Sequence, residues 1–291
     1  MLLMIVCGVL LIGGVALTVV WSGERLVEPP TPQALTGPRA PASEPGQRMP
    51  RHLAGLKVYV WWATVFTVLG TVSGLVITGA GGRLIMRLLA ETSPEATGRI
   101  TEALARVGDI TVDGTTVYLV FGAFPAAFGS AALYLLVAPW LPPGRLGGPT
   151  YGLLLLVTVA PFLDPLRASN VDFAIVGPGW LALLLFAALA VLQGAFLASL
   201  AGRLSRSLPL LTRERWLGPA APLLAAVVLV PVGVVLAVGA VVAFAFPRAL
   251  PWLLAARASR PGMVTGRIIL AIAVVAALPA FLATVVTIVQ R

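Results

Sequence analysis

Residues 57–80, KVYVWWATVFTVLGTVSGLVITGA, form an apolar stretch with one charged residue, Lys57, at its first position. A helix needs about 20 consecutive apolar residues to cross the hydrocarbon core of a bilayer, which is about 30 Å thick. The stretch meets this length without an internal charge. It therefore predicts a transmembrane helix.

Six further stretches have a similar composition, and together with the first they predict an all-α polytopic transmembrane helical bundle of about seven spans. They cover residues 2–20, 115–138, 148–163, 175–199, 219–246 and 268–289. The stretch 148–163 is short, so it either crosses with tilt or is re-entrant. Pro231 predicts a kink or two half-helices within 219–246.

The composition supports this class. The chain of 291 residues is 59% hydrophobic and 11% charged, whereas soluble domains are about 25% charged. Its net charge of +9 comes from basic residues spread among the spans, so no nucleic acid is expected as a partner. The expected partners are the lipid bilayer and, as a further candidate, another membrane protein.

The chain divides into an N-terminal transmembrane anchor over 1–20, a Pro-rich flexible linker over 21–54, and a multi-span membrane domain over 55–291. The first segment lacks a positive leading region and a small-residue cleavage pattern, which favours an anchor over a removable signal peptide. The linker suggests that the anchor is an extra module. Translation from Met1 and translation from Met49 both stay open.

One polar segment predicts an amphipathic surface helix at about 94–107. Ser93 is a suitable N-cap, Pro94 suits the first helical position and Gly108 suits the end. The pairs Glu95–Arg99 and Glu102–Arg106 have the spacing that stabilises a helix. We interpret the segment as a solvated covering helix, with a gate or a partner-binding lid as the alternative.

Small residues recur at a spacing of four in three spans, which is typical of close helix packing in membranes. A path for a solute is the alternative interpretation. The three rows are Gly70, Gly74, Thr78 and Gly82; Gly122, Ala126 and Ser130; and Ala190, Gly194, Ala198 and Gly202.

Two groups of charged residues are candidate sites. Asp164, Arg167, Asn170 and Asp172 lie between the fourth and fifth spans and are a candidate ion or partner site, with ordinary turn chemistry as the alternative. Arg83 and Arg87 lie one helical turn apart and are candidate contacts for an anionic lipid, with snorkelling to the headgroups as the alternative.

The sequence predicts no catalytic residue, metal site or cofactor. Cys7 is the single cysteine and His52, in the linker, is the single histidine, so the usual metal ligands and general bases are scarce. The patterns of zinc peptidases, serine hydrolases, P-loop proteins and dinucleotide-binding proteins do not occur. We therefore expect that the protein is not an enzyme.

The stretches GGRLIMRLLAETSPEATGRIT (81–101) and FLDPLRASNVDF (162–173), with GPGW (177–180), resemble a group of uncharacterised multi-pass membrane proteins of high-GC bacteria. The resemblance covers about Leu56 to Trp180. It implies a location in the bacterial cytoplasmic (inner) membrane, and no function or site residue.

These observations favour an accessory, scaffolding or regulatory membrane component. The alternative is a small-solute or ion transporter that uses the Asp164–Asp172 region. Lys and Arg divide almost equally between the two sides of a seven-span arrangement, so the sequence leaves the orientation open.

Overall fold

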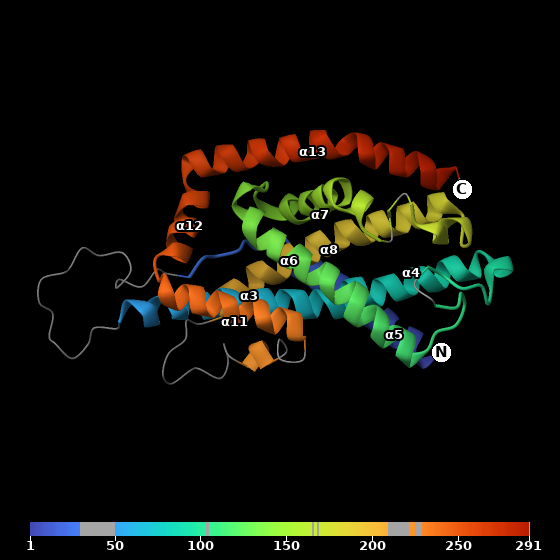
Figure 1. Ribbon diagram of the computed structural model, residues 1–291, viewed down its shortest axis with the longest axis horizontal. Helices are drawn as coiled ribbons and strands as arrows, with labels where there is room; N and C mark the ends of the chain where they lie inside the picture. The colour runs from blue at the N-terminus through green and yellow to red at the C-terminus, as the bar shows by residue number, and fades with distance from the viewer. Residues whose placement is uncertain are drawn as a thin grey trace, which may run out of the picture.

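The computed structural model describes residues 1–29, 50–102, 105–164, 166–167, 169–208, 221–224 and 229–290. Every element in these ranges is a helix, and the β-pairing within them is a single isolated bridge. Figure 1 shows an elongated bundle with both termini at one end. The predicted all-helical class is therefore confirmed.

The N-terminal helix α1 (Leu2–Val20) packs into the bundle, against α4 and α8. Gly14 allows a further close contact with residues 74–79, which precede α4, because a Cβ there would lie within 2.6 Å of the Val76 and Ile77 side chains. Cys7 is buried on the same helix. The first span thus packs against the rest of the bundle, and its role as a separate anchor stays a prediction.

The segment after α1 stays attached to the bundle. The Val27 amide donates to Ser205 Oγ at 3.0 Å, and Glu24 lies against Gly202. The predicted linker 21–54 also ends earlier than expected, because α3 begins at Arg51. Residues 30–49 lie outside the described residues, so their flexibility stays a prediction.

A continuous helix of 41 residues follows, made of α3 (Arg51–Ser73), the π-helix η1 (Gly74–Gly79) and α4 (Ala80–Glu91). The next span is built from α5 (Val112–Tyr118), the π-helix η3 (Leu119–Ala123), α6 (Phe124–Val137) and the short η4 (Ala138–Trp140). The two π-helices contact each other. Tyr118 Oη donates to the Thr78 carbonyl at 2.9 Å across this contact.

Two of the three small-residue rows pack as predicted. Gly70 and Gly74 face the Phe128 and Phe124 rings of α6, where a Cβ would come closer than 3 Å. On α8, a Cβ at Gly194 would lie 2.4 Å from the backbone nitrogen of Gly152 on α7. These contacts are the tight backbone approaches that small residues permit in membranes.

The third row, Gly122, Ala126 and Ser130, is wrong in part. Ser130 is buried as predicted, whereas Ala126 is exposed and Ala127 is buried beside it. An α-helix turns once every 3.6 residues, so its buried stripe alternates steps of three and four, as Ala127, Ser130 and Tyr134 do. A strict spacing of four therefore leaves the buried stripe of α6.

The tightest helix pair is α7 (Gly147–Thr158) with α8 (Gly179–Ser207), and the turns η5 (Gly144–Leu146), η6 (Ala160–Phe162) and η7 (Val171–Ala174) flank α7. α7 has 12 residues, which is about 18 Å of helix. The expected span over 148–163 is therefore not a membrane-length helix, because regular α-helix stops before Pro161.

The C-terminal part runs through α11 (Val230–Ala245), α12 (Ala249–Ala258) and α13 (Arg260–Val289), preceded by the turn η8 (Ala221–Leu223). Pro231 does not kink a helix, because it lies in the first turn of α11, where its missing N–H costs nothing. The bend of 96° instead separates α11 from α12. Of the predicted span 219–246, residues 219–220 and 225–228 lie outside the described residues.

Five helices in the described residues are long and apolar enough to cross a membrane, and the bent pair α11–α12 makes a sixth candidate. The five are α1, α3 to α4, α5 to η4, α8 and α13. The expectation of about seven spans is not confirmed. The sequence-based count is higher by one because it includes the stretch 148–163, where α7 is too short to cross a membrane.

The amphipathic helix expected at 94–107 is wrong. Its helical part is the short turn η2 (Pro94–Ala96), and Gly98 has a φ of +81° that ends it. An antiparallel bridge joins Ile100 to Arg106, and the Gly98 amide donates to the Val107 carbonyl at 3.0 Å. Residues 103 and 104 lie outside the described residues. Residues 98–100 therefore pair with residues 106–107 through backbone hydrogen bonds and do not form a helix.

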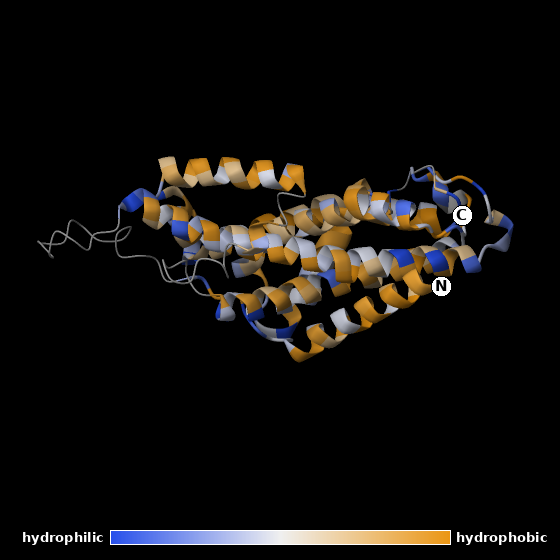
Figure 2. Cartoon of the chain, turned by 90° about the horizontal axis from the view of Figure 1, so that it is seen from below, coloured by the Kyte–Doolittle hydropathy of each residue, from blue (hydrophilic) through white to orange (hydrophobic). Residues whose placement is uncertain are grey.

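The bundle has two polar ends, and Figure 2 shows the apolar residues concentrated between them. At one, which we name the basic end, Pro247 lies against Gly55, Arg145 lies against Gly23, and Arg257 binds Glu28. At the other, the loop end, the connections 92–111 and 163–178 meet. The connection 247–259 thus shares an end with residues 21–29, whereas seven spans would place it opposite.

Candidate functional site

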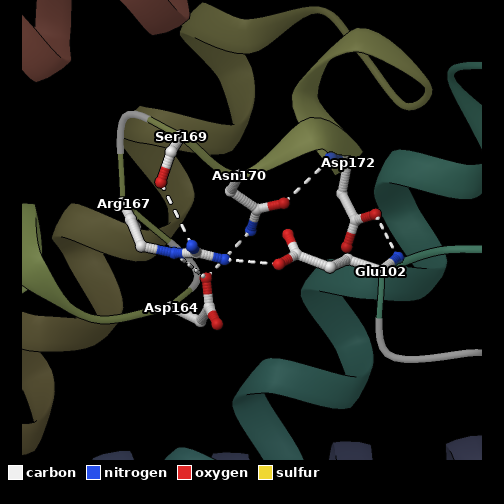
Figure 3. A network of polar contacts seen from close by, with 6 residues as sticks. All are labelled: Glu102, Asp164, Arg167, Ser169, Asn170 and Asp172. Carbon is white, nitrogen blue, oxygen red and sulfur yellow. Dashed lines mark hydrogen bonds and ion pairs between the residues drawn. The ribbon is translucent and has the colours of Figure 1, made fainter.

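The predicted site residues Asp164, Arg167, Asn170 and Asp172 come together at the loop end, as Figure 3 shows. Arg167 Nε lies 3.2 Å from Asp164 Oδ1, and Asn170 Nδ2 donates to the same oxygen at 3.3 Å. The Asp172 amide donates to Asn170 Oδ1 at 2.8 Å. The clustering expected from the sequence is therefore present.

Two residues that the sequence did not assign to this site, Glu102 and Ser169, complete the group, which we name the loop clasp. Glu102 Oε1 pairs with Arg167 Nη2 at 2.7 Å, and the Glu102 amide donates to Asp172 Oδ1 at 2.8 Å. Ser169 Oγ accepts from Arg167 Nη1 at 3.1 Å. Glu102 lies 65 residues from Arg167, so its part in the clasp has no local sequence pattern.

A second set of bonds ties the same two connections together. Ser93 Oγ donates to the Gly177 carbonyl at 2.6 Å and accepts from the Gly177 amide at 2.9 Å. Thr92 Oγ1 also donates to the Gly177 carbonyl at 3.0 Å. Ser93, expected to cap a helix, thus holds the end of α4 against the start of α8.

The electrostatics of the loop clasp centre on Arg167. Its hydrogen bonds to Glu102 and Asp164 raise the pKa of the guanidinium above its usual range. The side chains of Arg167, Glu102 and Asp164 are 33%, 44% and 65% exposed. Exposed pairs of this kind contribute little to stability. The clasp can attract a cation or a partner from water, and its polar bonds join two connections.

Arg83 and Arg87 share one face of α4, as predicted, but their surroundings differ. Arg87 forms an ion pair with Glu91 and donates to the Gly108 carbonyl at 3.2 Å. Arg83 is 9% exposed and lies over the Tyr118 ring, 5.1 Å from its centroid. It makes no hydrogen bond or ion pair within the described residues.

Sequence reasoning missed a second buried arginine, at the basic end. Arg257 Nη2 pairs with Glu28 Oε1 at 2.8 Å, and its Nη1 donates to the carbonyls of Leu135 and Leu136 in the last turn of α6. The guanidinium also lies 5.3 Å from the Trp62 ring centroid. A cation suits the carbonyls at a helix C-terminus. We name this group the arginine clamp.

A third polar group lies in the middle of the bundle. Gln193 Nε2 of α8 donates to Ser73 Oγ and to Ser130 Oγ, each at 3.1 Å. Tyr151 Oη of α7 donates to the Ser130 carbonyl. An amide inside an otherwise apolar span is typical of interhelical hydrogen bonding, so Gln193 was recognisable from the sequence.

No three His, Cys, Asp or Glu side chains lie close enough to hold a metal ion in the part of the chain that the structure describes. A hollow of about 190 Å³ lies at the basic end between α1, α7 and α8, with Glu24, Arg145 and Ser199 on its wall. Comparison of the chain with protein family models, curated protein sequences and solved structures gives no match.

Proposed function

We propose that the chain is a multi-pass component of the bacterial cytoplasmic membrane that acts as an accessory, scaffolding or regulatory partner of another membrane protein, without catalysing a reaction. The observation that supports this most is the position of α13. It lies along the outside of the bundle (Figure 1), and only 11% of its most apolar stretch is buried.

The outward face of α13 is a continuous apolar stripe. Its members recur at helical spacing and are each more than half exposed: Val264, Ile268, Ile272, Val275, Leu282 and Val286. A helix with such a face contacts lipid or the helix of another membrane protein. A scaffold would present this type of surface to its partner.

The polar groups inside the bundle support the same proposal. Gln193 of α8 donates to Ser73 of α3 and to Ser130 of α6, so it joins three helices. Arg257 binds a carboxylate and two carbonyls. These polar groups hold helices of the bundle to one another and are used within the fold, which suits a scaffold.

The experiment is photo-crosslinking along α13 in native membranes. A photoreactive amino acid at Val275, which is 71% exposed, is compared with the same residue at Ala277, which is 9% exposed. We expect a discrete protein adduct, identified by mass spectrometry, from position 275 and none from 277. Adducts to lipid alone from 275 would contradict the proposal.

Transport of a small solute or ion through the Asp164–Asp172 region is the second candidate. The loop clasp favours it, because the carboxylates of Glu102 and Asp164 pair with the Arg167 guanidinium at the loop end, and the Asp172 carboxylate accepts from the Glu102 amide beside them. In liposomes, Asp164→Asn and Asp172→Asn would then abolish flux while leaving folded yield intact. Flux by the purified protein alone would move transport to first place; unchanged flux in both variants would remove this region as its site.

The charges also support an orientation. Within the described residues the basic end carries two acidic groups, Glu24 and Glu28. Its basic groups are Arg25, Arg51, Lys57, Arg145, Arg203, Arg206, Arg248, Arg257, Arg260 and Arg267. Basic residues collect on the cytoplasmic side of membrane proteins. We therefore propose that the basic end is cytoplasmic and the loop end is external.

Cysteine labelling tests this orientation. In a Cys7→Ser background, an impermeant maleimide added to intact cells should label Glu95→Cys at the loop end and leave Ser207→Cys at the basic end unlabelled. Both positions are exposed, so accessibility within the fold does not distinguish them. The reverse pattern would invert the orientation.

A further inference from the structure

Arg83 is the buried charge that the fold leaves without a counter-charge. It is 9% exposed, and within the described residues it makes no hydrogen bond or ion pair. The nearest aromatic ring, that of Tyr118, supplies only a cation–π contact, with its centroid 5.1 Å from Arg83 Cζ. Burying an unpaired charge is costly, so such a residue calls for a partner.

Three helices enclose this guanidinium. Arg83 belongs to α4, Tyr118 belongs to α5, and α1 packs along the same part of α4. Glycine allows the close approach of Tyr118, because a Cβ at Gly82 would collide with the phenol oxygen. Gly114 of α5 lies next to the guanidinium, since a Cβ there would be in ordinary contact with Arg83 Nη2 at 3.6 Å. The side chain is thus held in a defined position between the helices.

The guanidinium of Arg83 is sealed at one nitrogen and not at the other two. Nε is sealed without a partner, whereas Nη1 and Nη2 make no hydrogen bond and are not sealed. These two nitrogens form the planar fork that binds two oxygens of one phosphate group. Arg83 also lies near the end of an apolar helix, where lipid headgroups meet the protein.

From this geometry we infer that Arg83, held over Tyr118 between α1, α4 and α5, is a binding site for one phosphate-bearing anion, supplied by an anionic phospholipid headgroup or by dissolved phosphate. Arg87 is not part of the site, because Glu91 and the Gly108 carbonyl already satisfy it. Arg83 and Arg87 therefore have different roles, although their sequence spacing places them on one helix face.

The test is thermal unfolding of delipidated protein in a neutral detergent, with phosphatidylglycerol or inorganic phosphate added. The variants are Arg83→Gln and, as the matched control, Arg87→Gln. We expect phosphatidylglycerol, inorganic phosphate or both to raise the Tm of the wild type and of Arg87→Gln by several degrees, and to leave that of Arg83→Gln unchanged. Stabilisation by phosphatidylglycerol alone identifies a lipid, and stabilisation by inorganic phosphate identifies the free anion.

An equal rise in all three proteins, or no rise in the wild type with either addition, would overturn the inference. If Arg83→Gln does not fold, Arg83→Lys replaces it as the test variant. Lysine keeps the charge but lacks the planar pair of nitrogens, so the concentration of phosphatidylglycerol or phosphate that gives half of the Tm rise should increase several-fold. An unchanged concentration for Arg83→Lys would also contradict the site. These measurements need no partner protein, so they stand apart from the test on α13.

Discussion

Arg83 and Arg257 are buried to a similar extent, but they differ in the polar groups that contact them. Arg83 and Arg257 are 9% and 8% exposed, and each lies a little over 5 Å from an aromatic ring centroid. Arg257 also binds the Glu28 carboxylate and two backbone carbonyls. Within the part of the chain that the structure describes, Arg83 contacts the Tyr118 ring and makes no hydrogen bond or ion pair.

We interpret this difference as one of role: Arg257 stabilises the fold, whereas Arg83 binds an anion. Removing one partner of a satisfied buried pair strands the other, which destabilises a fold. Removing an unpaired buried charge strands nothing. The same substitution at the two positions should therefore have opposite effects on stability, although burial alone makes the positions look alike.

The largest expected effect is that of Arg257→Met. The change leaves the carbonyls of Leu135 and Leu136 and the Glu28 carboxylate without their cation, which should cost about 2–3 kcal/mol of unfolding free energy. Thermal unfolding in detergent should show a Tm several degrees below that of the wild type. An unchanged Tm would mean that the arginine clamp does not stabilise the bundle.

A double-mutant cycle sharpens this result. Glu28→Gln alone should cost less than Arg257→Met, because the Glu28 side chain is 37% exposed and Arg257 keeps its carbonyl contacts. The coupling energy between the two changes should be about 1 kcal/mol. Strictly additive effects would show that residues 21–29 are not held through this pair.

Tyr118 tests the ring beneath Arg83. Tyr118→Leu removes the cation–π contact and should destabilise the protein by about 1 kcal/mol in the absence of an anion. Tyr118→Phe is the control, since it keeps the ring and loses the hydrogen bond from the hydroxyl to the Thr78 carbonyl. If Phe is as damaging as Leu, the bond to Thr78 and not the ring carries the effect.

The smallest expected effect belongs to the loop clasp. Arg167→Gln removes exposed ion pairs to Glu102 and Asp164, which water largely replaces, so the Tm should not change measurably. The change should instead make the connections 92–111 and 163–178 exchange amide protons faster. A large drop in Tm would show that the loop clasp, like the arginine clamp, stabilises the fold.

The sequence predicts those features that depend on local composition. Long apolar stretches locate the spans, and the glycines of α3, η1 and α8 lie at close helix contacts. The short spacing of Asp164, Arg167 and Asn170 predicts that these side chains meet. Each of these inferences needs only neighbours within a few turns.

The failures depend on contacts that are remote in sequence or on the helical period. Arg257 and Glu28 are 229 positions apart, so no pattern links them. The charge pairs in 94–107 favour a helix locally, but Gly98 and the bond from the Glu102 amide to Asp172 hold a different shape. A fixed spacing of four also leaves the buried stripe of α6, because the helix turns every 3.6 residues, so it selects the exposed Ala126.

The most direct measurement compares Arg83→Met and Arg257→Met side by side, as purified, delipidated proteins in a neutral detergent without added anion. We predict that Arg257→Met lowers the Tm by several degrees, while Arg83→Met leaves it equal to or above that of the wild type. A drop for Arg83→Met as large as that for Arg257→Met would show that both arginines are structural and would contradict the account.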